Sequence, residues 1–285
     1  NINKMVLMLN GANYFSKLDL KSAYHQVKLH QTSKYLTAFI TMEGVFQFKR
    51  LPFGLALAAC VFQRLMSDVL VGIKNVLVYQ DDILIYGRSL REHNVILDVV
   101  LNRLKDANMT LKKEKCKFGV KEVEYPGYTL SSGTVRPKRN LLEAISNAPA
   151  PVDKEQLRSF LGLIEFYAKF VENFAEKTED LRVLLRKGAN YKWGAEQQKA
   201  FEEIKRNLVE ANFLTPFDSS LGTVITVDAS KIGIGAVLTQ KHKEGEKTIA
   251  FASRTLTKTE RNYAVIEKDA LAVAWSLEYF RNDIW

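Results

Sequence analysis

Short β-rich apolar runs alternate with stretches of helical spacing along the first half of the chain. Four strand-like segments are rich in Val, Ile, Leu, Phe and Tyr and are separated by polar turns. They lie within residues 15–30, 36–54, 76–87 and 115–131. The second segment predicts a hairpin with Met42-Glu43-Gly44 as its turn, and the third predicts a hairpin that carries Asp81 and Asp82.

Two stretches between these strands place apolar residues three and four positions apart, which predicts amphipathic helices at 56–70 and 89–109. In the first helix we expect the apolar stripe to run through Cys60 or Val61, Leu65 and Val69. Strands and helices in this order indicate an α+β segment.

The pattern changes twice in the second half. From about Arg136 to about residue 210 the spacing predicts almost continuous helix, with Pro149 and Pro151 just before one helix start and a break at Gly188–Gly194. Beyond Pro216 the chain predicts three short strands and one long helix. These cover residues 223–230, 235–240, 248–256 and about 259–279. The chain therefore predicts α+β, then α, then α+β.

The composition is typical of a globular protein of two or three domains. The chain has 285 residues, of which 47% are hydrophobic and 26% charged. Its longest apolar run is too short for a bilayer, and no basic-then-apolar leader opens the chain. Cys60 and Cys116 stand alone and the four histidines are scattered, so a disulfide framework and zinc or histidine metal sites are not expected. Such cysteine usage indicates an intracellular setting.

Positive charge gathers after the double aspartate. The net charge is +9, which favours an acidic partner such as nucleic acid. Lys112, Lys113 and Lys115 head a cluster that continues with Lys117 and Lys121. A track for a phosphate backbone has this pattern, and so does a merely solvated face. The sequence leaves both interpretations open.

Three carboxylates form the first candidate for chemistry. Asp19 ends an apolar strand, and Asp81 and Asp82 lie in a hairpin. Carboxylates on adjacent strands provide oxygen ligands for two Mg²⁺ ions, which suits phosphoryl transfer and offsets the repulsion between neighbouring acids. The alternative is a turn dipeptide and a strand-end residue without chemistry, because Asp is common in turns.

An ordered series of motifs distinguishes these alternatives. The stretches LDLKSAYHQV, LPFGLALAACVFQ, YQDDILIY and YPGYTL resemble the palm of a reverse transcriptase. SFLGLIEFYAKFVENFA and WGAEQQKAFEEIK extend the resemblance to gypsy-type LTR retrotransposon polyproteins. The resemblance implies an α+β fold with three domains: a palm with partial fingers at 1–130, a helical thumb or connection at 131–215, and a truncated ribonuclease H-like α/β domain at 216–285.

The resemblance also implies roles for single residues. Asp19 and Asp81 match ligands of both catalytic metals, Mg²⁺ or Mn²⁺, and Asp82 completes the triad. The nucleotide pocket is implied at Leu20, through its carbonyl, Tyr24, as the gate against a 2′-hydroxyl, and Phe53, Gly54 and Gln80. The primer grip is implied at Tyr125, Pro126, Gly127 and Tyr128. For Tyr24, ordinary core packing is the alternative.

The sequence departs from the family pattern in three places. GLALAACVFQ stands where relatives usually have GLTNAPATFQ, and Pro126 replaces a bulky apolar residue of the primer grip. The chain also begins close to the first catalytic motif, so the upstream finger strands that hold the triphosphate are expected to be missing.

A second candidate site follows from TVDASKIGIGAVLTQ, which resembles the opening of a retroelement ribonuclease H domain. Asp228 matches its first metal ligand. Counting back from AVAWSL places the next acid at Asp269, one methylene shorter than the usual Glu, whereas Glu267 lies about 200° around the helix. No later aspartate strand follows, so we expect an incomplete nuclease. The Gly233/Gly235 pair lacks the third Gly of a dinucleotide loop.

The leading hypothesis is an RNA-directed DNA polymerase with a partial ribonuclease H. Its partners would be an RNA template, a DNA primer and dNTPs, without a membrane, in a cytoplasmic retroelement particle or the nucleus. The alternative is a degenerate or domesticated fragment that binds nucleic acid without catalysis. The oligomeric state stays open.

Overall fold

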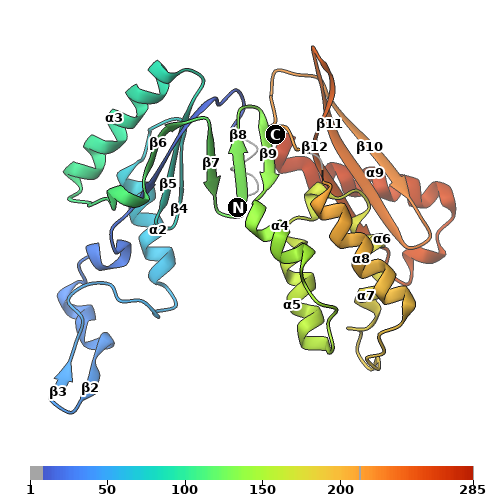
Figure 1. The fold of residues 1–285 in the computed structure, drawn as a ribbon, viewed down its shortest axis with the longest axis horizontal. Coiled ribbons are helices and arrows are strands. Elements are labelled where there is room, and N and C mark those ends of the chain that lie inside the picture. The colour runs from blue at the N-terminus through green and yellow to red at the C-terminus, as the bar shows by residue number, and fades with distance from the viewer. Residues whose placement is uncertain (1–8, 212, 285) are drawn as a thin grey trace. The chain divides into compact units, whose positions relative to one another are not determined.

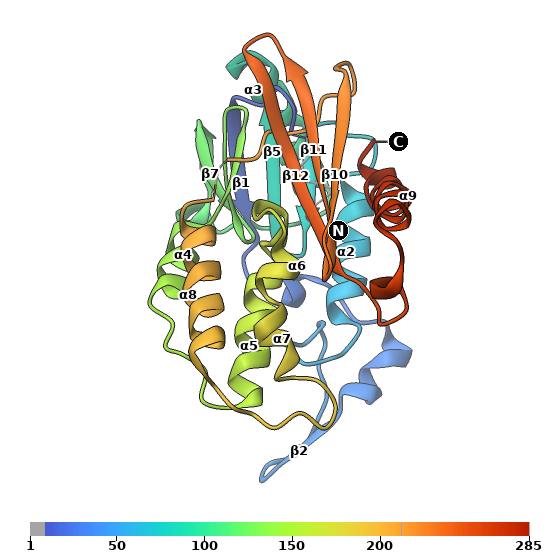
Figure 2. The same cartoon turned by 90° about the vertical axis from the view of Figure 1, so that its right-hand side faces the viewer.

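The computed structural model describes residues 9–211 and 213–284. The chain forms two compact units, one from Gly11 to Tyr125 and the other from Pro126 to the C-terminal end (Figures 1 and 2). The second unit therefore groups the predicted helical segment with the predicted ribonuclease H-like segment, and their division into separate domains stays a prediction.

A four-stranded antiparallel sheet forms the centre of the first unit. Its strand order is β4-β5-β1-β6. The strands are β1 (Tyr14–Asp19), β4 (Val76–Tyr79), β5 (Asp82–Gly87) and β6 (Lys117–Val120). Tyr79 of β4 lies opposite Asp82 of β5, so that a two-residue turn joins them. The hairpin predicted around the double aspartate is confirmed.

Two helices cover one face of this sheet: α2 (Ala58–Val69) and α3 (Leu90–Asp106). The predicted helices are confirmed, and the Ser89 hydroxyl caps α3 by accepting the Glu92 N–H at 3.2 Å. The stripe expected on α2 is right only in part. Phe62 and Met66 are buried with Ala58, Leu65 and Val69 are half-buried, and Cys60 and Val61 are exposed. The apolar residues of this helix form a broad arc, so spacing alone did not select the part of the arc that packs.

The aliphatic core of the first unit lies between α2, α3 and the sheet. Its buried members are Leu18, Leu20, Ala23, Phe62, Met66, Leu70, Ile83, Ile85, Val100 and Leu104. By strand alternation, Leu18, Ile83 and Ile85 point to the helices, and Asp19 and Asp82 therefore point to the other face. The packing of the core thus sets the direction of both carboxylates.

The remaining part of the first unit contains short elements: the 3₁₀ turns η1 (Ala23–Gln26), η2 (Gln31–Thr37) and η3 (Lys113–Lys115), and strand β7 (Glu122–Tyr125). The predicted hairpin at 36–54 is β2 (Phe39–Thr41) with β3 (Gly44–Phe46). It projects from the body of its unit in Figure 1, and all six of its strand residues are exposed.

The second unit begins with a hairpin of β8 (Tyr128–Ser131) and β9 (Thr134–Pro137) and continues with helices. These are α4 (Arg139–Ser146), α5 (Lys154–Glu165), η4 (Ala168–Phe170), α6 (Phe174–Lys177), α7 (Glu179–Val183) and α8 (Ala195–Val209). Strand β9 corrects the prediction of helix from about Arg136. Val135 exchanges backbone hydrogen bonds with Leu214, a partner too distant in sequence for local spacing to indicate.

The last part of the second unit is an antiparallel sheet of three strands, covered by one helix. The elements are β10 (Thr223–Ala229), β11 (Gly233–His242), β12 (Gly245–Thr255), η5 (Glu260–Asn262) and α9 (Val265–Ile284). The predicted strands are confirmed, and the helix begins six residues after the expected Thr259. Ile234, Leu256 and Ala272 form a buried contact between sheet and helix.

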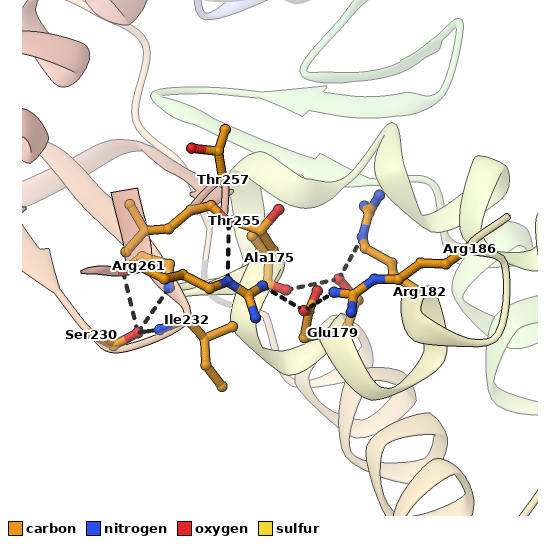
Figure 3. A network of polar contacts seen from close by, with 12 residues as sticks. Ala175, Glu179, Arg182, Arg186, Ser230, Ile232, Thr255, Thr257 and Arg261 are labelled. Carbon is orange, nitrogen blue, oxygen red and sulfur yellow. Dashed lines mark hydrogen bonds and ion pairs between the residues drawn. The ribbon is translucent and has the colours of Figure 1, made fainter. Parts of the chain in front are cut away.

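A charge network around the buried Glu179 joins the short helices to the segment that follows β12 (Figure 3). The Glu179 carboxylate accepts hydrogen bonds from Arg186 and, at 2.7 Å, from Arg261. Arg261 also donates to the Leu256 carbonyl at 3.1 Å. Because Glu179 is 7% exposed, its charge depends on both arginines for compensation.

Among the described helices, none combines the length and apolarity needed to cross a membrane.

Candidate functional site

The register of the central sheet brings two of the predicted carboxylates together. Asp19 at the end of β1 lies directly opposite Asp82 at the start of β5. Residues opposite each other in an antiparallel pair have Cβ atoms about 4.5–5.5 Å apart on one face. Asp81 precedes Asp82 in the turn, which it shares with Gln80. Gln80 has a φ of 55°, an uncommon value for a residue with a side chain.

A residue that the sequence did not single out, Gln63 on α2, holds this turn. Its Oε1 accepts the Gln80 N–H at 2.8 Å, and its Nε2 donates to the Val78 carbonyl at 3.1 Å. One amide thus satisfies both hydrogen-bonding groups at the end of β4. The sequence gives Gln63 no distinct signal, because α2 also carries the polar residues Arg64, Ser67 and Asp68.

A cavity of about 900 Å³ opens beside the carboxylates. Asp19 and Asp81 both line it. Four of the five residues predicted to bind nucleotide also line it, namely Leu20, Tyr24, Phe53 and Gln80. Gly54 and Asp82 are not in its lining. The site predicted from dispersed motifs is therefore one concave surface of the first unit, with two exceptions.

The position of Tyr24 is compatible with both roles considered above, contact with a nucleotide and ordinary core packing. Its ring lies 5.1 Å from the Phe53 ring and 5.3 Å from the buried Phe62 ring, measured between centroids. It also lines the cavity. Aromatic packing therefore fixes the position of the ring, while one side stays available to a molecule in the cavity.

The three predicted track lysines line the same cavity. They lie at η3, and the loop is fixed to β1 because the Lys112 N–H donates to the Asp19 carbonyl at 2.8 Å. Lys115 reaches further, with its Nζ 3.7 Å from Asp19 Oδ2. Lysine ammonium groups and carboxylates thus lie side by side in one cavity, an arrangement that suits a phosphorylated ligand with a divalent cation.

Asp82 has a different environment from the other two acids. Lys17 Nζ lies 2.9 Å from Asp82 Oδ1. Burial raises the pKa of Asp82 above its ordinary value, and the nearby charges of Asp81 and Asp19 add to the increase, although Lys17 opposes it. Burial and the like charges together outweigh the favourable lysine.

The donor set fits a hard divalent cation only in part. Asp19 and Asp81 place carboxylate oxygens in one cavity, the ligand type that Mg²⁺ and Mn²⁺ prefer. Within residues 9–211 and 213–284, however, no three acidic, histidine or cysteine side chains have the spacing of a metal cluster. The ammonium groups of Lys115 and Lys17 lie beside Asp19 and Asp82 and already supply positive charge to these two carboxylates.

The predicted primer grip lies at the end of β7 and the start of β8. Tyr125 and Tyr128 are 1% and 0% exposed, whereas Pro126 and Gly127 are half-buried. Tyr128 stacks on Phe166, with ring centroids 5.1 Å apart. The two tyrosines therefore belong to cores, and the more accessible part of this motif is the Pro126-Gly127 turn.

The second candidate site is not assembled in the same way. Asp228 on β10 lies opposite Gly235, which lies opposite Ser253 on β12. Asn173 packs over Gly235, and the Ala175 N–H donates to Ser253 Oγ at 2.9 Å. Elements before and in α6 therefore cover this row of the sheet.

The acids expected on α9 lie elsewhere. Val227 and Ala229 pack with the cluster that contains Ala272 of α9, so alternation directs Asp228 to the opposite face. Glu267 accepts the Ala264 N–H at 2.7 Å and caps the helix, and Asp269 is exposed. Within the described part of the chain, the structure does not bring Asp228 and Asp269 into one metal cluster.

Family models match both units. Residues 3–130 match the model described as reverse transcriptase (RNA-dependent DNA polymerase). Residues 193–285 match the model described as RNase H-like domain found in reverse transcriptase.

Two curated relatives illustrate the similarity along the whole chain. The retrovirus-related Pol polyprotein from transposon 412 of Drosophila melanogaster is 35% identical over 100% of this chain and 23% of its own length. The transposon Tf2-7 polyprotein of Schizosaccharomyces pombe is 33% identical over 99% of this chain and 21% of its own length. The chain thus spans less than a quarter of these relatives.

Solved structures give the same result. The foamy viral protease-reverse transcriptase dRH in complex with double-stranded DNA has a TM-score of 0.90 and 27% identity, covering 98% of this chain and 50% of that chain. The foamy viral protease-reverse transcriptase in complex with an RNA/DNA hybrid has a TM-score of 0.86 and 27% identity, covering 100% of this chain and 39% of that chain.

Proposed function

Because the chain belongs to the reverse transcriptase and ribonuclease H region of LTR-retrotransposon polyproteins, we propose that its first unit is the catalytic centre of an RNA-directed DNA polymerase. The observation that carries the proposal is the sheet register. It sets Asp19 opposite Asp82, with Asp81 in the adjoining turn and a cavity beside them. The proposed reaction joins a dNTP to the 3′-hydroxyl of a DNA primer on an RNA template.

Domains of these two families generally use divalent metal ions. Asp19 and Asp81 would hold Mg²⁺ or Mn²⁺, with the Leu20 carbonyl as a further oxygen, and Asp82 stands next to them. When bound, two such ions lower the pKa of the primer hydroxyl and neutralise charge that develops on the transferred phosphoryl group. The protein's own contribution is to orient the carboxylates, through the β1–β5 register and Gln63.

The other residues of the cavity would select and hold the nucleotide. Tyr24, fixed between Phe53 and Phe62, would lie against the sugar and exclude a 2′-hydroxyl by contact. Gln80 would adjoin the primer end. Lys112, Lys113 and Lys115 would neutralise phosphates of the nucleotide or of the template–primer. The Pro126-Gly127 turn would contact the primer.

The whole polyprotein's substrates and partners are part of the same proposal. The similar foamy viral proteins are described in complexes with double-stranded DNA and with an RNA/DNA hybrid, which supports a hybrid as the partner of this chain. A cytoplasmic retroelement particle or the nucleus stays the predicted location.

The second candidate function is nucleic-acid binding without catalysis. Two observations favour it. Asp19 and Asp82 each lie within ion-pair distance of a lysine, and the acids of the second site do not form a metal cluster within the described residues. Such a protein would bind a hybrid through charge and would not extend a primer.

Primer extension distinguishes the two functions. Residues 1–285, and a longer chain that includes the preceding coding sequence, are supplied with an RNA template, a DNA primer, dNTPs and Mg²⁺. We expect extension that is lost in Asp81→Asn, with hybrid binding retained. Hybrid binding without extension by either chain would favour the second function.

A further inference from the structure

The three carboxylates of the candidate site differ in their counter-ions. Asp81 has no ion pair with any described residue, and its side chain is exposed in the turn. Asp19 has a loose partner, Lys115, at 3.7 Å. Asp82 has a close partner, Lys17, at 2.9 Å. We therefore expect the three carboxylates to differ in how readily they bind a metal ion.

The two lysines also differ in their surroundings. The Lys17 side chain is 23% exposed and lies on β1, two residues before Asp19 and on the same face of the sheet. The Lys115 side chain is 59% exposed and lies at the end of η3. Lys115 can therefore turn into solvent at little cost, whereas Lys17 is enclosed by the strands beside it.

We propose that Lys17 is a positioning residue that holds Asp82 as its permanent counter-ion, so that Asp19 and Asp81 alone are the carboxylates that bind the divalent cation. This inference rests on the proposed polymerase function. It assigns a role to a lysine that the family motifs did not single out, and gives a reason why Asp82 stands next to the other two acids without binding metal.

The argument is one of charge compensation. A cation that recruits Asp82 has to displace a partly buried ammonium group, which is then left without its carboxylate in a poorly solvated position. A cation that recruits Asp19 displaces only the exposed Lys115, and one that recruits Asp81 displaces nothing. The cavity agrees with this order, because Asp19 and Asp81 line it and Asp82 does not.

Lys17 also reduces the electrostatic repulsion among the three carboxylates. Three carboxylates within two adjacent strands and one turn repel one another in every state of the protein, whether a metal is bound or not. One ammonium group on the same face neutralises one of them before any ion arrives. Two acids then remain free to bind divalent cations.

Mn²⁺ binding to residues 1–285, followed by the electron paramagnetic resonance of free Mn²⁺, tests the proposal without catalysis. We expect Asp19→Asn and Asp81→Asn each to weaken Mn²⁺ binding by about tenfold or more, the loss of one charged ligand. Asp82→Asn should leave the affinity within about twofold, a change below the range of a lost ligand. An Asp82→Asn loss equal to that of Asp19→Asn would overturn the proposal.

A lysine pair provides the matched control. Lys17→Met should free the Asp82 carboxylate and strengthen Mn²⁺ binding, and the gain should vanish in the double variant Lys17→Met/Asp82→Asn. Lys117, exposed and opposite Lys17 in the β1–β6 register, lacks a described ion pair, and Lys117→Met reports the effect of losing one positive charge. Equal gains in Lys17→Met and Lys117→Met would contradict the positioning role.

The proposal and the polymerase function fail in distinguishable ways. Mn²⁺ that binds normally but is insensitive to Asp19→Asn and Asp81→Asn, or absent Mn²⁺ binding, overturns the proposed site as a whole. Mn²⁺ that depends equally on all three acids overturns only the role of Lys17. Lys17→Met leaves the partly buried Asp82 carboxylate without its ion pair and can destabilise the fold. Lys17→Arg therefore serves as the conservative variant and should retain the unfolding temperature and the Mn²⁺ affinity of the wild type.

Discussion

Substitution of Gln63 by Met should disturb the candidate site without touching any carboxylate. Met matches the length of Gln but supplies neither of the two hydrogen bonds to the β4–β5 turn, at 2.8 Å to the Gln80 N–H and 3.1 Å to the Val78 carbonyl. A typical hydrogen bond contributes about 0.5–1.5 kcal/mol net. The Gln80 N–H lies in an exposed turn and regains water, so the expected destabilisation is about 1–2 kcal/mol.

The effect on chemistry should be larger than the effect on stability. A loss of about 1–2 kcal/mol lowers the unfolding temperature of the first unit by roughly 4–8 °C. Gln80 has a φ of 55°, and without Gln63 the turn that carries Asp81 is free to relax. A displacement of about 1 Å at a catalytic group costs about a hundredfold in rate. Primer extension by the longer chain should therefore fall by about that factor.

Ser67 provides the control on the same helix. Its hydroxyl donates only to the Gln63 carbonyl one turn earlier, so Ser67→Ala should leave extension unchanged. Gln63→Glu retains an acceptor for the Gln80 N–H and loses the donor to Val78, and should give an intermediate loss. Wild-type unfolding temperature and wild-type extension in Gln63→Met would refute the reasoning that Gln63 holds the turn.

Four further outcomes are expected. Tyr24→Ala should admit ribonucleotides during primer extension and Tyr24→Phe should not, whereas unchanged sugar discrimination in both would leave Tyr24 a packing residue. Reversal of Lys112, Lys113 and Lys115 to Glu should flatten the salt dependence of hybrid binding, by contrast with the exposed Lys243 of the other unit. Hydrogen bonds from Arg254 and Thr257 lower the pKa of Glu260 to about 2. The ionised Glu260 therefore contributes its full share of stability at any pH above its ordinary pKa of 4.5, and this share is lost as the pH falls toward 2. Glu260→Gln should remove this part of the acid transition. Residues 1–285 should not cleave the RNA strand of a hybrid, and cleavage that disappears in Asp228→Asn would contradict this.

Local patterns predicted most of the elements. Alternation and turn residues indicated the double-aspartate hairpin, and apolar spacing indicated α2 and α3, because strand and helix periods are properties of short segments. Strand β9 was missed, although it forms a tight hairpin with β8, because four residues are too few for strand alternation to distinguish them from the helix that follows. The buried face of α2 was predicted only in part, because within a broad apolar arc the shape of the neighbouring elements decides which residues are fully buried.

The contacts that orient the candidate site were not predictable from motifs. Gln63 and Lys17 act through distances to Gln80 and Asp82 that only the sheet register and the packing of α2 determine. The motifs predict which residues carry chemistry, and the fold adds the contacts of those residues with their neighbours. Lys17 had no signal at all, because an exposed and a pairing lysine look alike in a strand.

The two candidate sites differ in what brings their acids together. Asp19 and Asp82 are partners in the β1–β5 register, so the pairing of two strands places them opposite each other. A meeting of Asp228 with an acid of α9 depends instead on how that helix is rotated, and two positions along a helix change the direction by about 200°. In this chain Ala272 faces the sheet, Glu267 caps the helix and Asp269 is exposed. A strand register therefore brings the carboxylates of the first candidate site together within one unit, whereas the acids of the second candidate site need further contacts around Asp228 before two ions would have enough ligands.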